Sequence, residues 1–352
     1  MAAQEIIGET MKSTLLLGLI AALAGPALAQ TPEDHFFKGK TITIAVGAPP
    51  GGTLDPYARL MQKFLGARIP GNPNIVVTNV PGASSNVLAR QIYATAPKDG
   101  TMIGEVFHGV AMEPLIGQGD QRGFDPSRFA WLGSSHPEIA ACAVRTDMAV
   151  KNPTDFLTQE VVLGSTSPGS PPFDFPTIAN RILGTKFKLV TGYGGGQAMM
   201  LALERREVDG LCIAWSTMKT HLPDILGGKR HARVIAQSEM EATAEFKAAD
   251  VPPLASLAKT QEDREALAFF YGPNAFGGPF ILPPGVPEAR IALLRKAFRE
   301  VFGDPEAAAE AQRLNIDWAP LAGEEVQQRV EKIYAASPQV IARVKAALSP
   351  PK

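Results

Sequence analysis

Four loops of this sequence combine glycines with hydroxyl residues directly before an amphipathic segment. In the first half of the chain the residues concerned are Gly51, Gly52, Thr53, Asp55, Ser84, Ser85 and Asn86. In the second half they are Ser165, Thr166, Ser170, Gly195 and Gly196. Backbone N–H groups at a helix start lack partners within the helix and carry about half a positive charge, so they bind carboxylates or phosphates without Lys or Arg. We interpret these residues as candidate ligand-binding groups of one anion site.

The alternative for each loop taken alone is ordinary turn and helix-cap chemistry. Asp55 suits the N-cap of a helix predicted over residues 55–65 as well as contact with a ligand amine or hydroxyl. His108, Tyr193 and Trp215 each follow a predicted strand, which makes them further candidate ligand contacts. For Trp215, packing in the core is the rival interpretation.

Signatures of catalysis, cofactors and metals are missing from the sequence. Gly39-Lys40-Thr41 ends like a phosphate-binding loop, but Asp34 occupies the position of the required upstream glycine. Residues 164–169 do not fit the G-x-S-x-G nucleophile elbow, and no G-x-G-x-x-G opens a helix. The five histidines show no i, i+4 metal spacing. We therefore expect a protein that is not an enzyme and has no metal or cofactor.

Composition narrows the class of protein further. The chain has 352 residues, a net charge of -1 and no run of Lys or Arg, so we expect no nucleic-acid partner. An apolar fraction of 45% is ordinary for a globular protein, and the length allows one large domain or two of ordinary size. The 33 glycines and 30 prolines suit an α/β protein better than a helical bundle.

The first 29 residues have the pattern of a targeting segment. Lys12 is followed by an apolar run over residues 15–23 and then by Ala27-Leu28-Ala29, which is the order found in a cleavable signal peptide. We therefore expect removal of residues 1–29, with Met11 as the true start, and export of the rest to the periplasm. A buried N-terminal helix is the alternative. No later apolar run is long enough to span a membrane.

The elements that must position the loops alternate between strand and helix. Strands predicted over residues 41–46, 75–77 and 102–106 are separated by helices over 55–65 and 86–96, an order that implies a parallel sheet. The pattern recurs with strands over 161–163, 187–190 and 210–214 and helices over 174–183 and 197–206. Extended connectors are predicted over 131–145 and 269–282, and helices over 288–302, 305–314, 323–334 and 338–348.

This order predicts an α/β fold with two lobes, each a doubly wound and mainly parallel sheet. Residues 36–130 and 272–352 form lobe 1 in this division, and residues 131–271 form lobe 2. Ligands of such sheets bind at the carboxyl ends of the strands. We therefore expect the four loops to face one cleft between the lobes.

Several motifs resemble those of one receptor family. Residues 49–55, with Ala58-Arg59 after them, are similar to the first-loop signature of the tripartite tricarboxylate transporter solute receptors, the Bug family. Further similar segments are 79–86, 96–101, 192–195, 207–210, 283–287 and 304–306, in the family's order. The resemblance implies a type II-like periplasmic binding protein, expected as a monomer. It also implies that the lobes close on a small organic carboxylate, held by backbone N–H groups, hydroxyls and waters, for delivery to membrane permease subunits.

Three features depart from the family's pattern. Thr53 stands where a third glycine is usual, and Ser84-Ser85 replace a pair of glycines. The loop over residues 165–172 is rich in proline and is followed by Phe173 and Phe175. These aromatic side chains favour a ligand with an apolar or aromatic body over citrate.

Two other functions stay open. One is a ligand-sensing receptor for a membrane kinase. The other is a secreted hydrolase, which a nucleophile–histidine pair in the cleft would support.

Cys142 and Cys212 both lie in predicted strands. In folds of this type the strand entering the second lobe runs antiparallel beside a later strand of that lobe, which makes the two cysteines plausible neighbours. Opposed residues on antiparallel strands are close enough for a disulfide, and the periplasm permits one. Two buried thiols are the alternative.

Overall fold

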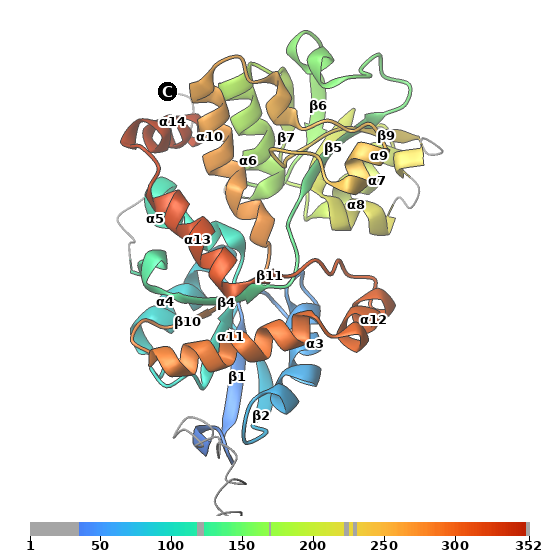
Figure 1. Cartoon of the computed structure of the whole chain (residues 1–352). Helices are drawn as coiled ribbons and strands as arrows, with labels where there is room; N and C mark the ends of the chain where they lie inside the picture. The colour runs from blue at the N-terminus through green and yellow to red at the C-terminus, as the bar shows by residue number, and fades with distance from the viewer. Residues whose placement is uncertain (1–34, 118–122, 169, 222–224, 228–230, 350–352) are drawn as a thin grey trace, which may run out of the picture.

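The computed structural model describes residues 35–117, 123–168, 170–221, 225–227 and 231–349 of the chain. The predicted signal peptide and the start at Met11 lie outside this part. The described residues form two lobes, each built around one sheet, which Figure 1 shows one above the other.

The first lobe contains a mixed sheet of six strands in the order β11-β4-β10-β3-β1-β2. The strands are β1 (Thr41–Val46), β2 (Asn74–Asn79), β3 (Met102–Glu105), β4 (Ala130–Ser134), β10 (Pro279–Leu282) and β11 (Leu321–Ala322). β1 pairs in parallel with β2 and β3, as predicted, whereas β10 is antiparallel to both β3 and β4. In β1, Ile42 and Ile44 enter one core cluster and Ala45 another, so the strand is buried on both faces.

The helices of this lobe are α3 (Asp55–Leu65), α4 (Asn86–Thr95), α5 (Glu113–Ile116), α11 (Glu288–Phe302), α12 (Pro305–Arg313) and α13 (Gly323–Tyr334). They follow the predicted positions closely, except for the short α5, which the sequence did not predict. The buried face of α3 includes Leu60, Met61, Phe64 and Leu65, which the helical spacing predicts. Its N-cap is Leu54 and not Asp55, because the helix begins at Asp55 itself.

The second lobe contains a mixed sheet of five strands in the order β7-β6-β8-β5-β9. The strands are β5 (Ala140–Arg145), β6 (Val161–Gly164), β7 (Phe187–Val190), β8 (Gly210–Ala214) and β9 (Ala232–Gln237), and the helices are α6 (Pro171–Ile178), α7 (Gly196–Glu204), α8 (Trp215–His221), α9 (Ala244–Ala248) and α10 (Gln261–Tyr271). β6 pairs in parallel with β7 and β8, while β5 is antiparallel to β8 and β9.

The two predicted connectors differ in how far they are extended. Residues 131–145 contribute β4 to one sheet and β5 to the other, so this connector is extended as predicted. The return over residues 269–282 is not, because its first three residues are the last turn of α10. A capping box formed by Thr260 and Asp263 starts that helix, and the apolar run that follows continues it.

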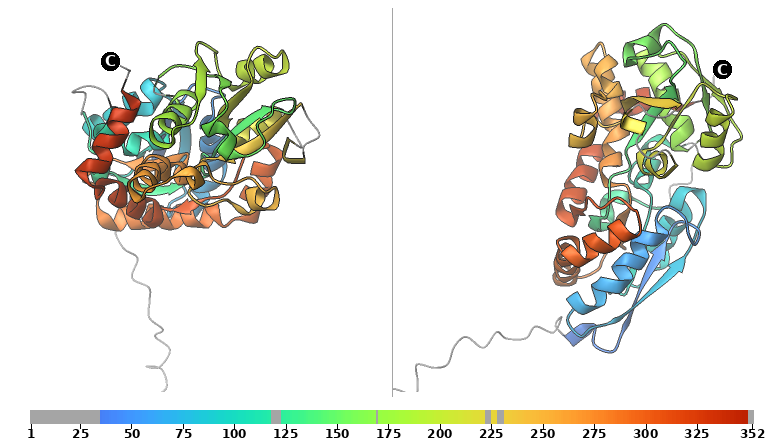
Figure 2. Two further views of the ribbon diagram at one scale, coloured as in Figure 1. Left: turned by 90° about the horizontal axis from the view of Figure 1, so that it is seen from above. Right: turned by 90° about the vertical axis from the view of Figure 1, so that its right-hand side faces the viewer.

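The C-terminal helix α14 (Pro338–Leu348) makes a third link between the lobes. It packs against α10 and α6 of the second lobe and also against α5 of the first. Figure 2 (right) shows the orange and red helices of the C-terminal part along one side of both lobes. The expected division assigns residues 272–352 to the first lobe. Val340, Val344 and Ala347 of α14 are buried in a core cluster that contains residues of both lobes.

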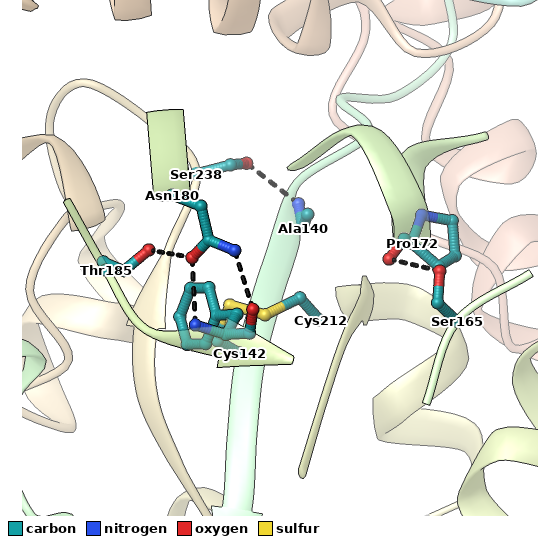
Figure 3. Close-up of a disulfide and its surroundings, with 9 residues drawn as sticks. Ala140, Cys142, Ser165, Pro172, Asn180, Thr185, Cys212 and Ser238 are labelled. Atoms are coloured by element: carbon teal, nitrogen blue, oxygen red, sulfur yellow. Dashed lines mark hydrogen bonds between the residues drawn. A yellow bond between two sulfur atoms is a disulfide. The ribbon is translucent and has the colours of Figure 1, made fainter. Parts of the chain in front are cut away.

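A disulfide joins Cys142 of β5 to Cys212 of β8 (Figure 3). The two residues are opposed in the antiparallel pair, with a Cα–Cα distance of 4.0 Å, which confirms the predicted pairing. Near the start of β5, the Ala140 N–H donates to the Ser238 Oγ at 2.9 Å. These bonds tie the strand that enters the second lobe to its neighbours on both sides.

Candidate functional site

A cavity of about 770 Å³ lies where the ends of the strands of both lobes meet. The first lobe contributes loops that precede α3 and α4, together with α5. The second lobe contributes the start of α6, and the end of α10 and the end of α14 complete the wall. Candidate residues from the sequence that line the cavity are Thr53, Ser84, Asn86, His108 and Ser170.

The first loop is held in shape by Asp55, which is only 5% exposed. Its carboxylate accepts from the Gly51 N–H at 3.0 Å, from Arg59 Nε at 2.8 Å and from Asn79 Nδ2 at 2.9 Å. Burial opposes ionisation of Asp55, but these hydrogen bonds outweigh it and lower the pKa. The Gly52 N–H donates to Pro49 O at 2.9 Å. Gly51, Gly52 and Asp55 therefore organise the loop.

Thr53 is the residue of this loop that reaches the cavity. No acceptor for its backbone N–H is found in the part of the chain that the structure describes. Thr53 precedes the N-cap Leu54, so its N–H lies near the positive end of the α3 helix dipole. An anion in the cavity would supply the missing acceptor.

The second loop is held by Ser85, whose side chain is fully buried. Its Oγ donates to Gly47 O at 3.0 Å and accepts from the Phe107 N–H at 3.1 Å. A Cβ on Gly47 would lie 2.3 Å from this Oγ, so glycine is required for the two loops to meet. Ser85 thus fastens the loops together and does not face the cavity.

The neighbours of Ser85 carry the polar groups of this loop into the cavity. Ser84 and Asn86 both line it. Ala83, Ser84 and Ser85 all have positive φ, at 45°, 50° and 71°, which is strained for residues with a Cβ. The buried Asn86 Oδ1 has no hydrogen-bond partner among the described residues. This loop is therefore strained and has an unused polar group beside the cavity.

Two ionisable groups lie at the end of strand β3 and just after it, the buried Glu105 and the half-buried His108. Glu105 is fully buried, and burial together with the charge of Asp55 raises its pKa well above the ordinary value. Burial lowers the pKa of His108, which lines the cavity, and its Nδ1 is buried without a partner among the described residues. The lowered pKa leaves His108 neutral near pH 7, so it supplies no positive charge to the cavity.

In the second lobe, Ser165 and Thr166 shape the loop before α6, and Ser170 reaches the cavity. The Ser165 Oγ is buried and donates to Pro172 O at 3.1 Å (Figure 3). The Thr166 Oγ1 and Ser170 Oγ lie 2.5 Å apart. Of these three residues, Ser170 lines the cavity.

The remaining candidates of the second lobe lie outside the cavity. Trp215 is 4% exposed, packs against Phe246 and donates its Nε1–H to Glu245 Oε2 at 2.9 Å, so its ring belongs to the core of the lobe. Tyr193, Gly195 and Gly196 follow β7, which is an edge strand and the strand farthest from the crossing strand β5. None of the three lines the cavity. Ligand contact by these residues stays a prediction that requires the lobes to close further.

Sequence reasoning missed most of the apolar wall. The side chains concerned are Phe107, Met112, Ile116, Phe270, Tyr271 and Leu348. Phe173 and Phe175, which the sequence singled out, belong to the same wall. The others come from segments that are distant in sequence, so no local spacing indicates that they share one surface.

A serine–histidine pair lies near the crossing but outside the cavity. The Ser135 Oγ is 2.9 Å from the His136 Nδ1, and the His136 ring stacks on Tyr57 with centroids 3.9 Å apart. Ser135 is fully buried and His136 is 2% exposed, so a substrate has no access to either. The described residues contain no metal-binding cluster of His, Cys, Asp or Glu, and no helix among them is long and apolar enough to cross a membrane.

Comparison with solved structures identifies the architecture. A TctC solute binding protein from Polaromonas, solved without ligand, has a TM-score of 0.67 at 16% sequence identity, covering 88% of this chain and 99% of that one. The chain has the fold of the TctC and Bug periplasmic binding proteins. The periplasmic binding protein BugD has a TM-score of 0.59 at 19% identity, covering 88% and 98%. MatC from Rhodopseudomonas palustris, solved with malate, has a TM-score of 0.60 at 19% identity, covering 89% and 100%.

These matches confirm the predicted two-lobed fold. They are binding proteins and not enzymes, which fits the absence of catalytic signatures from the sequence. No protein-family profile matches the chain, and no curated protein sequence matches it significantly.

Proposed function

We propose that this protein is a periplasmic solute receptor that captures a small organic carboxylate for a tripartite tricarboxylate-type transporter. The observation that carries the proposal is the convergence of Thr53, Ser84, Asn86 and Ser170, from both lobes, on one cavity. Backbone N–H groups at helix starts hold a carboxylate without a cation. The malate bound to the structurally similar MatC supports this ligand class.

Delivery to membrane permease subunits and export by the predicted signal peptide over residues 1–29 are parts of the same proposal. A receptor for a membrane kinase would use the same cavity and differs only in its partner. A secreted hydrolase is less well supported, because the Ser135–His136 pair is buried away from the cavity.

Thermal unfolding in the presence of carboxylates tests the proposal. A ligand at 100 times its dissociation constant raises the free energy of unfolding by about 2.7 kcal/mol. We expect at least one member of a panel of mono-, di- and tricarboxylates to raise the melting temperature, and the matched primary amides to have no effect. A panel in which amides and carboxylates behave alike would contradict an anion site.

A further inference from the structure

The cavity is lined by polar groups of the loops before α3, α4 and α6 and by mainly apolar side chains of α5, α6, α10 and α14, and we call these two parts its polar end and its apolar end. Its polar end is formed by Thr53, Ser84 and Asn86 of the first lobe with Ser170 of the second. Its apolar end is formed where α14 packs against α5, α6 and α10. The apolar and aromatic side chains that line it there are Met112, Ile116, Phe173, Phe175, Phe270, Tyr271 and Leu348, while Glu113 of α5 and Asp174 of α6 line the cavity from the same helices.

Burial shows that this apolar end belongs to a continuous core. Ile116, Phe175 and Tyr271 are less than a tenth exposed and belong to the core cluster that spans both lobes. Phe270 and Leu348 are half-buried and pack against that cluster. The half-buried side chains keep apolar surface available toward the cavity. Covering it with an apolar group of a ligand stabilises the complex in proportion to the area removed from water.

The charges around the cavity disfavour a second carboxylate on the ligand. Glu113, Glu138 and Asp174 line it, and among the described lining residues Arg181 is the one lysine or arginine side chain. Arg181 is exposed, and the half-buried His108 is neutral because burial of its ring lowers its pKa. A second carboxylate would therefore be brought beside like charges and apolar side chains, and both raise the free energy of the bound state.

Resting on the proposed capture of a carboxylate, we infer that the natural ligand is a monocarboxylate with an apolar body, an alkyl chain or an aryl group. Its carboxylate lies against Thr53, Ser84 and Asn86, and its body lies between α5, α6 and α10, with Leu348 of α14 at the far end. The volume of about 770 Å³ falls in the range of roughly 300–1,000 Å³ that holds drug-sized ligands.

Two matched series of ligands test this inference by isothermal titration calorimetry. One consists of butanoate, hexanoate, octanoate and decanoate, and the other of the dicarboxylates of equal carbon number. We expect affinity for the monocarboxylates to rise about fourfold per added methylene until the apolar end is filled. We expect each dicarboxylate to bind more weakly than the monocarboxylate of equal length.

A variant at the far end separates this inference from the general proposal. Leu348→Glu should lower octanoate affinity by about tenfold or more while leaving butanoate affinity unchanged, because only the longer chain reaches it. Leu314→Glu is the control, since Leu314 is 46% exposed outside the cavity and should change neither affinity. Phe270→Ser is a second variant, with the same expected pattern, should Leu348→Glu unfold the chain.

The outcomes are distinguishable. Dicarboxylates that bind more tightly than monocarboxylates, or an affinity independent of chain length, would overturn the apolar-body inference and leave carboxylate capture standing. Failure of both series and of the wider carboxylate panel would overturn the proposed function and this inference with it.

Discussion

Removing the disulfide between Cys142 and Cys212 should lower the free energy of unfolding by about 4 kcal/mol. The two cysteines are 70 residues apart. Closing a loop of this length lowers the entropy of the unfolded chain, which stabilises the folded state by about 4 kcal/mol. Both side chains are at most 1% exposed, so reduction requires unfolding. Urea unfolding of the wild type with and without a reducing agent measures the difference directly.

The double variant Cys142→Ala with Cys212→Ala is the control for this measurement. Its unfolding should not respond to reductant and should match that of the reduced wild type, apart from the small volume lost in the core. Ligand affinity should be unchanged, because neither cysteine lines the cavity. A reduced wild type within 1 kcal/mol of the oxidised protein would refute the loop-entropy reasoning.

Three further perturbations test the loops, the buried charges and the contact between lobes. Thr53→Pro removes the N–H that precedes the N-cap of α3 and should weaken binding of every carboxylate alike by about 1–3 kcal/mol, measured by calorimetry; an unchanged affinity would contradict the role of that N–H. Burial raises the pKa of Glu239 to about 7, against the opposing charge of Arg329. Because this value exceeds the ordinary 4.5, its contribution to stability is complete below pH 4.5 and is lost as the pH rises through 7. As the pH rises from 4 to 8.5, the free energy of unfolding of Glu239→Gln should therefore rise by on the order of 3 kcal/mol relative to that of the wild type, measured by urea unfolding. A difference between the two proteins that does not change with pH would be inconsistent with this. The Lys219 Nζ lies 2.6 Å from Asp317 Oδ1 and joins α8 to the first lobe, with both side chains about a third exposed. Lys219→Ala should change ligand affinity by about 0.2–1 kcal/mol, an effect that 1 M salt removes; a larger, salt-independent change would require another explanation.

Local signals in the sequence determined the elements of this fold and the order in which they occur. The alternation in residues 41–46, the apolar face of residues 55–65 and the glycines and prolines between them each act over a few residues. The right-handed connection of parallel strands then places the loops after β1, β2 and β6 at the ends of their sheets. Thr53, Ser84, Asn86, His108 and Ser170 could therefore be predicted to line one cavity.

Only the tertiary structure decided which side chains of those loops form hydrogen bonds that hold the loops in place and are therefore not available to a ligand. Ser85, Ser165 and Asp55 satisfy hydrogen bonds within or between loops, and buried polar groups must find such partners. Trp215 follows a strand as a pocket residue would, but a neighbouring helix offers it an aromatic contact and a carboxylate.

The apolar end of the cavity depended on tertiary structure most of all. It requires α5, α6, α10 and α14, which are far apart in the chain, to pack together. Hydrophobic burial has no direction and no fixed spacing in sequence. An apolar residue such as Ile116, Phe270 or Leu348 therefore predicts its own burial but not which residues will pack against it. The partner surface exists only once the chain has folded, and this is the surface that we infer contacts the body of the ligand.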